Sequence, residues 1–254
     1  MSYVKSLPYL PQRIVSLVPS QTELLFDLGL GEKVVGITKF CVHPAEKIKS
    51  VPKVGGTKKF HFEAIHALQP DLILGNKEEN YREGIEQLAA YYPVWISDIC
   101  TLADALSMIC KVGEFVGATD KAVPLATTIG DAFANLVPAF PVRVAYFIWR
   151  NPWMVAGNHT FIDDLLNRCG LANVFGHLPR YPAVSEVQIQ EAQPDCLLLS
   201  SEPYPFAEKH RAELQQLCPG AKVLLVDGEM FSWYGSRLVQ SPAYLTPLLK
   251  QITG

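Results

Sequence analysis

The chain has no run of 18 or more apolar residues, so no segment is predicted to span a membrane. It also has no long run of one charge: 22 basic and 25 acidic residues give a formal net charge of −3. A nucleic-acid-binding surface would need a basic stripe, so no nucleic-acid partner is expected. The N-terminus lacks the apolar core of a secretion signal. We therefore expect a cytoplasmic protein if Met1 is the native start, and a periplasmic or cell-surface protein if a leader was removed.

The common catalytic motifs are missing as well. The sequence contains no GxSxG, no GxxxxGK followed by Ser or Thr, and no HExxH. Asp163 and Asp164 are adjacent carboxylates, but on a predicted helix they face different directions. These absences favour a binding protein over an enzyme. A metal-cofactor-handling enzyme and a pure interaction module are the alternatives.

Cysteine pairs in CxxC spacing are also lacking. Several of the cysteines lie inside apolar runs, which predicts small buried residues rather than a disulfide framework. The six are Cys41, Cys100, Cys110, Cys169, Cys196 and Cys218.

What the chain does contain is a repeat. Residues 62–75 read FEAIHALQPDLILG and residues 186–199 read EVQIQEAQPDCLLL, at an offset of 124. Each copy predicts an amphipathic helix, a Gln-Pro-Asp break and a short buried strand. Two similar α/β halves predict two lobes, and small ligands commonly bind in a cleft between lobes.

Strands and helices are predicted to alternate in both halves, which is typical of parallel sheets covered by helices. In the first half Ser20 is a candidate N-cap with Glu23 as its capping-box partner, ahead of a helix over 21–28. The expected strands are 13–17, 34–37, 72–74, 94–96, 142–148, 196–199 and 222–226, and the expected helices of the repeated halves include 62–68, 81–90, 161–168, 209–217 and 242–252.

The middle of the chain, residues 101–137, shows no strand pattern. Thr101 and Asp120 are candidate N-caps for two successive helices, and Pro124 would fall in the first turn of the second. We therefore expect a helical connection between the halves rather than a flexible linker.

In this order, several segments resemble the helical-backbone (class III) substrate-binding proteins of ABC importers, which carry cobalamin, ferric siderophores or heme. The segments are RIVSLVPSQTELLFDLG, VVGITKFCVHP, HFEAIHALQPDLIL, IWRNPWMVAGNHTFIDDLLNRCGLANVF and VSEVQIQEAQPDCLLL. The resemblance implies an α/β fold of two Rossmann-like lobes, each with a parallel sheet flanked by helices, bridged by one long backbone helix. The expected limits are 1–118 for the first lobe, 119–138 for the bridging helix and 139–254 for the second lobe.

Loops after parallel strands are the usual places for ligand contacts. Ser20 and Gln21 follow the first predicted strand, and the resemblance implies that Phe40 and Tyr181 line the ligand cleft. Further aromatic side chains stand in loops beside Pro and Gly, where they could stack on a flat ligand, and Arg150 and Arg237 in the same loops suit ligand carboxylates or phosphates. These aromatic candidates are Trp149, Trp153, Phe231, Trp233 and Tyr234. Packing within a lobe and structural ion pairs, with Glu229 as a possible partner of either arginine, are the alternatives.

The expected ligand is a small molecule that may carry cobalt or iron, and no covalent cofactor is expected. His43 and His61 lie in loops from which one of them could reach a ligand-borne metal, but no metal site of the protein itself is predicted. The resemblance also implies an ABC permease as partner of a monomer. Glu63 matches one of its two docking carboxylates; Val187 stands at the second position, with Glu186 beside it. A leaderless cytoplasmic carrier or sensor is the alternative.

Replacing Glu63 with Ala is expected to leave ligand affinity unchanged and to reduce uptake, because the side chain would contact the permease rather than the ligand. Ligand affinity of the purified protein and uptake by cells would be measured side by side. Unchanged uptake would remove the docking role from Glu63.

Overall fold

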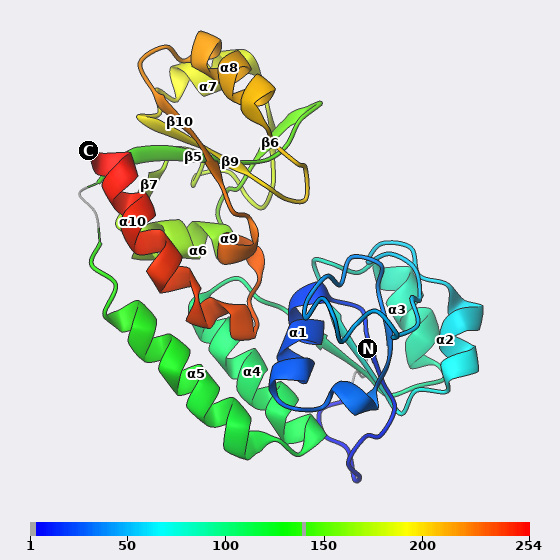
Figure 1. Ribbon diagram of the computed structural model, residues 1–254. Coiled ribbons are helices and arrows are strands. Elements are labelled where there is room, and N and C mark those ends of the chain that lie inside the picture. The colour runs from blue at the N-terminus through cyan, green and yellow to red at the C-terminus, as the bar shows by residue number, and fades with distance from the viewer. Residues whose placement is uncertain (1–3, 139–140) are drawn as a thin grey trace. The chain divides into compact units, whose positions relative to one another are not determined.

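The computed structural model describes residues 4–138 and 141–254. The chain forms two compact units (Figure 1). Unit 1 comprises Met1–Ile99, Ala103–Ile129 and Tyr234–Arg237, and unit 2 comprises Cys100–Leu102, Gly130–Trp233 and Leu238–Gly254. No helix among the described residues is long and apolar enough to cross a membrane.

Unit 1 is built on a four-stranded parallel sheet in the order β2-β1-β3-β4. Its strands are β1 (Ile14–Ser16), β2 (Val34–Ile37), β3 (Leu72–Asn76) and β4 (Val94–Ser97). The helices that lie wholly or mainly in this unit are α1 (Pro19–Asp27), η1 (Gly31–Lys33), α2 (Phe62–Leu68), α3 (Arg82–Ala89) and α4 (Leu102–Val116). The order of elements agrees with the alternation read from the sequence.

Unit 2 contains a six-stranded sheet in the order β10-β9-β5-β6-β8, with β7 paired to β5. The strands are β5 (Arg143–Trp149), β6 (Trp153–Val155), β7 (Ala172–Asn173), β8 (Ala183–Val184), β9 (Cys196–Ser200) and β10 (Lys222–Val226). The helices and turns of the second half are α6 (Phe161–Arg168), α7 (Glu186–Glu191), α8 (Glu208–Leu217), α9 (Glu229–Ser232), η2 (Ser236–Val239) and α10 (Ser241–Thr253).

The α/β class is as predicted, but the second sheet is mixed rather than parallel. Strands β10, β9, β5 and β7 run parallel, whereas β6 pairs antiparallel with both β5 and β8. Only residues 150–152 separate β5 from β6, and a parallel crossover needs a dozen or more residues. Asn151, with a left-handed φ of 67°, lies in this turn, so the chain reverses there.

Two predicted helix starts were wrong. Helix α1 begins at Pro19 with Val18 as N-cap, so Ser20 lies inside the first turn and is buried. Proline suits the first helical position because its φ is already helical and its missing N–H is not needed there. Helix α5 (Thr119–Ala134) begins before Asp120, which places Asp120 in the first turn and Pro124 inside the helix. Helix α4 begins directly after Thr101, as expected.

Helix α5 is one of the segments in which the chain passes from one unit to the other, here between Ile129 and Gly130. It covers most of the range expected for the bridging helix. The predicted lobe limits at 118 and 138, and the bridging role itself, stay predictions.

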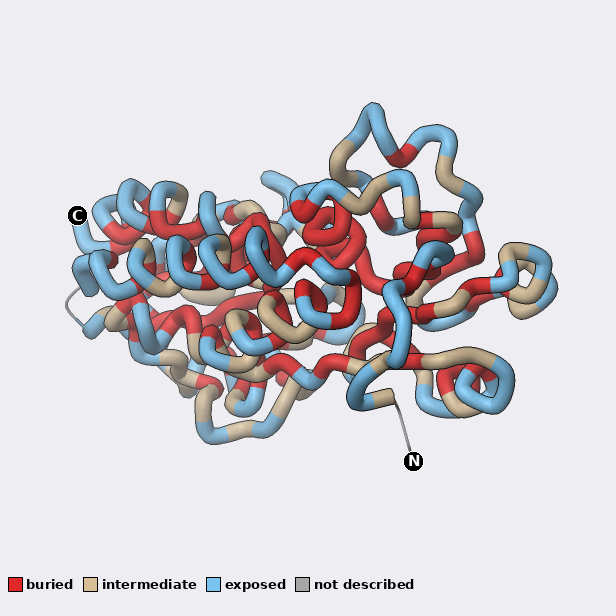
Figure 2. The backbone as a smooth tube through the Cα atoms, turned by 90° about the horizontal axis from the view of Figure 1, so that it is seen from below, coloured by how far each residue is buried: buried red, intermediate tan, exposed pale blue. Residues whose placement is uncertain are grey.

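The repeat is present as structure. Strands β3 and β9 correspond at an offset of 124 residues (196 − 72 and 200 − 76), as do the starts of α2 and α7. All residues of β3 and of β9 are buried, as expected for strands covered on both faces. Figure 2 colours the backbone by burial, with buried residues in red. Gln69 and Gln193 have left-handed φ values of 43° and 44°, so the helix-to-strand connection bends in the same way in both copies.

Each copy is held to its sheet by an arginine and an aspartate. In unit 1 the Arg13 guanidinium donates through Nε and Nη2 to the Leu68 carbonyl oxygen, at 2.9 and 2.7 Å. Asp71 accepts hydrogen bonds from the backbone N–H groups of Gln12 and Arg13, both at 2.8 Å. The end of α2 and the start of β3 are thereby fixed to the strand that begins the chain's first sheet.

Unit 2 repeats this arrangement with Arg143 and Asp195. Arg143 donates from Nη2 to the Ala192 carbonyl oxygen at 2.6 Å and from Nε to the Gln193 carbonyl oxygen at 3.1 Å. Asp195 accepts from the Arg143 backbone N–H at 2.9 Å. The carbonyl groups that a helix end leaves unpaired are thus satisfied by a charged donor.

Each unit has its own apolar core. The core beside the first sheet contains Val15, Leu17, Val54, Phe60, Ile65, Ile73, Ile85, Leu88 and Val94. The core beside the second contains Ala145, Phe147, Trp153, Val155, Phe175, Val184, Ile189, Leu197, Leu199, Phe206, Leu214, Ala221 and Val223. All six cysteines lie among the described residues, and none forms a disulfide; Cys41, Cys169 and Cys196 are buried and the other three are half-buried.

Arg143→Ala is expected to destabilise the protein by about 1–2 kcal/mol, because two carbonyl groups lose a charged donor at an exposed site. Urea unfolding followed by circular dichroism would measure the change. Arg211→Ala is the matched control: its exposed pair with Glu208 is expected to contribute less than about 1 kcal/mol. Equal effects of the two substitutions would contradict a special role for Arg143.

Candidate functional site

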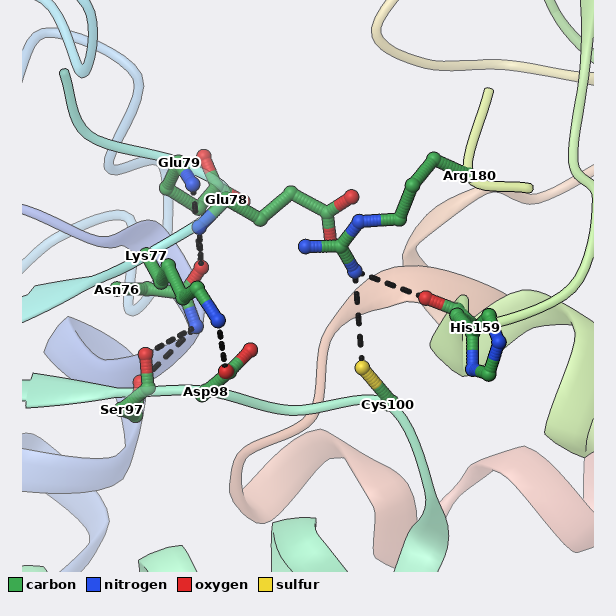
Figure 3. A network of polar contacts seen from close by, with 9 residues as sticks. All are labelled: Asn76, Lys77, Glu78, Glu79, Ser97, Asp98, Cys100, His159 and Arg180. Atoms are coloured by element: carbon green, nitrogen blue, oxygen red, sulfur yellow. Dashed lines mark hydrogen bonds and ion pairs between the residues drawn. The ribbon is translucent and has the colours of Figure 1, made fainter. Parts of the chain in front are cut away.

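The carboxyl edge of the unit 1 sheet carries an ordered polar network (Figure 3). Asn76, the last residue of β3, donates from Nδ2 to Oγ and O of Ser97 at the end of β4, at 3.0 and 3.2 Å. Its Oδ1 accepts from the backbone N–H groups of Glu78 and Glu79, at 2.8 and 3.1 Å. Asn76, which no sequence pattern singled out, joins the two strand ends and shapes the loop after β3.

Ser20 and Gln21 were predicted to meet a ligand, and the structure places both in the interior of unit 1. Gln21 donates from Nε2 to Ser97 Oγ at 2.7 Å, while its buried Oε1 has no hydrogen-bond partner. Their burial assigns them to the packing of α1 on the strand ends.

Arg237 forms a buried ion pair with Glu23 of α1. Its Nε and Nη2 donate to the two carboxylate oxygens of Glu23, at 2.9 and 2.6 Å. Burial raises the pKa of Glu23 above its ordinary value, and the Arg237 guanidinium offsets part of that rise. Glu23 and Arg237 are 214 positions apart in the sequence, so the pair joins two distant segments.

Arg150 likewise pairs with another glutamate, Glu213 of α8. The hydrogen bonds from Arg150 lower the pKa of Glu213. The guanidinium also lies 4.1 Å from the centre of the Trp153 ring, a cation–π contact. Both candidate arginines are thus held by carboxylates of their own unit.

The candidate aromatic residues divide sharply by exposure. Phe40, after β2, is 51% exposed and Trp149, at the end of β5, is 40% exposed. Tyr181 is half-buried. Trp149 packs edge-on against Tyr204, with ring centres 5.5 Å apart. Phe40 and Trp149 therefore present large apolar faces at the carboxyl edges of the two sheets.

The remaining aromatic candidates, Trp153, Phe231, Trp233 and Tyr234, are buried. Trp153 stacks on Phe206, with ring centres 6.2 Å apart, and Phe231 contacts Tyr146 at 4.9 Å. These rings were expected in loops, where no periodicity predicts burial, and the structure places them in packed surroundings.

Trp233 contributes to a carboxylate site that the sequence did not reveal. Its Nε1 donates to Oε1 of Glu202 at 2.8 Å, and Ser232 Oγ donates to the same oxygen at 2.7 Å. Burial raises the pKa of the Glu202 carboxyl despite these donors. Glu202 follows β9, and no sequence motif marked it.

In unit 2, Arg180 joins two further loops near Tyr181. Its Nη1 donates to the His159 carbonyl oxygen at 2.8 Å and lies 3.6 Å from Cys100 Sγ (Figure 3). Arg180 and His159 both have left-handed φ values, 59° and 55°. The contact fixes the backbone on which Tyr181 stands.

The histidine and docking candidates lie as follows. His43 is half-buried. His61 is exposed as the N-cap of α2. Glu63 and Glu186 are exposed in the first turns of α2 and α7. Val187, at the position equivalent to Glu63, is 59% exposed.

Comparison with known proteins adds the family. A family model described as periplasmic binding protein matches residues 14–218. A vitamin B12-binding protein from Pectobacterium carotovorum is 28% identical over 238 residues, covering 91% of this chain and 85% of the relative. One from Yersinia pestis is 29% identical over 199 residues, covering 74% of this chain and 69% of the relative.

Among solved structures, the periplasmic vitamin B12-binding protein BtuF of Vibrio cholerae has a TM-score of 0.83 at 21% identity, which shows the fold. The periplasmic heme-binding protein RhuT from Roseiflexus sp. RS-1 has a TM-score of 0.83 at 25% identity. Each match covers 96% of this chain and 99% of the other.

The chain belongs to the periplasmic binding protein family and, within it, to the class III substrate-binding proteins that its sequence resembles. It is a solute-binding protein and not an enzyme.

Glu202→Gln is expected to change how stability depends on pH. A raised pKa in the folded state means that wild-type stability is fully present below the ordinary value of 4.5 and is lost as pH rises through the folded pKa. The variant lacks this loss, so its stability relative to wild type should increase from pH 4 to pH 7.5 in urea unfolding.

Glu213→Gln is the control with the opposite sign. The lowered pKa of Glu213 gives stability that is present above the ordinary value and lost at lower pH, so this variant should lose stability relative to wild type as pH rises. Parallel pH profiles of wild type and the Glu202 variant would contradict the assignment of Glu202 as a desolvated carboxyl.

Proposed function

We propose that the protein binds a metal-bearing macrocycle, cobalamin or heme, as the substrate-binding component of an ABC importer. The observation that carries the proposal is the exposed aromatic residue at the carboxyl edge of each sheet, Phe40 after β2 and Trp149 at the end of β5. In parallel α/β sheets this edge is where ligands bind. Flat macrocycles need ring faces of this kind.

The fixed surroundings of these rings support the proposal. Lys39 lies over the Phe40 ring at 5.1 Å, and Trp149 leans on Tyr204. Rings that are positioned before binding lose little side-chain freedom when a ligand arrives. Of the other candidates, Tyr181 retains exposed surface, whereas Ser20, Gln21, Trp153, Phe231, Trp233, Tyr234, Arg150 and Arg237 would act by supporting these loops.

We infer transport from the family and from the placement of two carboxylates. The relatives that match in sequence include vitamin B12-binding proteins, and a structural neighbour at 25% identity is a periplasmic heme-binding protein. Glu63 and Glu186 are exposed at the N-terminal turns of the two equivalent helices, where an approaching permease could contact them. The proposal includes a periplasmic location and a protein that carries its ligand as a monomer.

The test is a titration of the purified protein with cyanocobalamin, hemin and a ferric catecholate, followed by absorbance and by thermal unfolding. A tight ligand raises the melting temperature by mass action. Binding of either macrocycle supports the proposal. Preference for the ferric catecholate would replace it with siderophore binding, and binding of none would overturn it.

Trp149→Ala is expected to weaken binding of the preferred ligand by about 1–3 kcal/mol, because a ring anchor is lost. Tyr91→Ala is the matched control, since Tyr91 is 70% exposed at the end of α3, away from the carboxyl edge. Affinities would be measured by absorbance titration, and variants would be compared only if their melting temperatures without ligand match that of the wild type. Unchanged affinity in the Trp149 variant would remove this ring from the site.

A further inference from the structure

A small hairpin lies at the carboxyl edge of the unit 1 sheet. Gly56 N–H donates to the Lys59 carbonyl oxygen at 2.7 Å, and Lys59 N–H donates back to Gly56 at 3.3 Å. Thr57 and Lys58 form its tip. Gly55 has a φ of +105°, and a Cβ there would lie 2.6 Å from the Lys59 carbonyl oxygen, so the turn requires glycine.

Contacts with the loops after β3 and β2 hold this hairpin, residues 55–60, in place. Asn80, in the loop after β3, donates from Nδ2 to the Thr57 carbonyl oxygen at 3.0 Å and to the Leu17 carbonyl oxygen, just past β1, at 3.2 Å. Lys39, just past β2, donates its backbone N–H to the Gly55 carbonyl oxygen at 2.8 Å. The hairpin is therefore part of the edge at which parallel sheets bind ligands.

Three lysines and one aromatic ring gather on this hairpin and the adjoining loop. Lys39, Lys58 and Lys59 are exposed, as is Phe40. A Cβ on Gly56 would lie 3.2 Å from the Phe40 ring and 3.7 Å from the Lys39 side chain, so both side chains rest on this glycine. Lys58 Nζ donates to the Glu78 carbonyl oxygen. We call Lys39, Lys58 and Lys59, together with the Phe40 ring beside them, the lysine cluster.

In the part of the chain that the structure describes, the lysines of this cluster form no ion pairs that would neutralise their charges. Elsewhere Lys49 pairs with Glu46, Lys77 with Asp98 and Lys111 with Glu114. Across residues 4–138 and 141–254, no carboxylate forms an ion pair with Lys39, Lys58 or Lys59. The Asp98 carboxylate, just past the end of β4, is engaged by Lys77 (Figure 3). Like charges held together in this way attract an anionic ligand.

We propose that the lysine cluster binds the free carboxylates of a ligand whose flat apolar face rests on Phe40. This inference rests on the proposed function and narrows it. The edge of heme carries two free carboxylates, whereas the side chains around the corrin ring of cobalamin end in neutral amides. The cluster therefore selects a carboxylate-bearing macrocycle over an amide-bearing one.

The experiment compares hemin with its dimethyl ester, which keeps the flat face and the iron but lacks both charges. Wild-type protein and the triple variant Lys39→Gln, Lys58→Gln, Lys59→Gln are titrated with each by absorbance, in the same dilute detergent. We expect wild type to bind hemin at least about tenfold more tightly than the ester, because each charge-assisted hydrogen bond contributes a factor of this order. The variant should lose this preference and bind the ester as wild type does.

The matched control removes the same charge elsewhere, with Lys49→Gln, Lys209→Gln and Lys250→Gln, three exposed lysines outside the cluster. Equal binding of hemin and ester to wild type, or equal losses in the two triple variants, would overturn the lysine cluster and leave the proposed function standing. Binding of cyanocobalamin alone would do the same. Failure of all three macrocycles to bind wild type would overturn both.

Discussion

The attachment of each helix–strand repeat to its sheet depends on one arginine. Arg13 and Arg143 stand where the central strands β1 and β5 begin, and their guanidinium groups hold the carbonyl groups at the ends of α2 and α7. The carboxylates of Asp71 and Asp195 accept hydrogen bonds from the backbone N–H groups of Arg13 and Arg143. Because the register of β3 and β9 follows from this attachment, the residues at their carboxyl ends are also placed by it.

Those carboxyl ends carry different side chains in the two units. In unit 1, β3 ends in Asn76, whose amide joins Ser97 and shapes the loop after the strand. In unit 2, the equivalent residue is Ser200, whose hydroxyl contacts Tyr146 and the backbone of Glu202. The two units therefore share the scaffold but differ in the side chains at the carboxyl edges of their sheets.

Burial and ion pairing divide the candidate residues into those engaged inside the protein and those whose side chains stay exposed to a ligand. The ion pairs Glu23–Arg237 and Arg150–Glu213 neutralise the two arginines that the sequence offered for ligand anions. Among the described residues, no carboxylate forms an ion pair with the lysines of the hairpin or with Lys39 in the loop after β2. The side chains left exposed for the proposed ligand contacts are therefore Phe40 and its neighbouring lysines in unit 1 and Trp149 in unit 2.

The amino-acid sequence by itself determined the order of helices and strands, the duplicated unit and the family, since apolar periodicity and the Gln-Pro-Asp break act over a few neighbouring residues. It identified Phe40 and Trp149 as candidates but gave the same weight to Phe231 and Trp233, because loop composition does not report burial. Only the tertiary structure paired Glu23 with Arg237 across 214 positions and brought Trp233 to Glu202. Exposure and ion pairing depend on which distant segments fold against a side chain, and that information is not local.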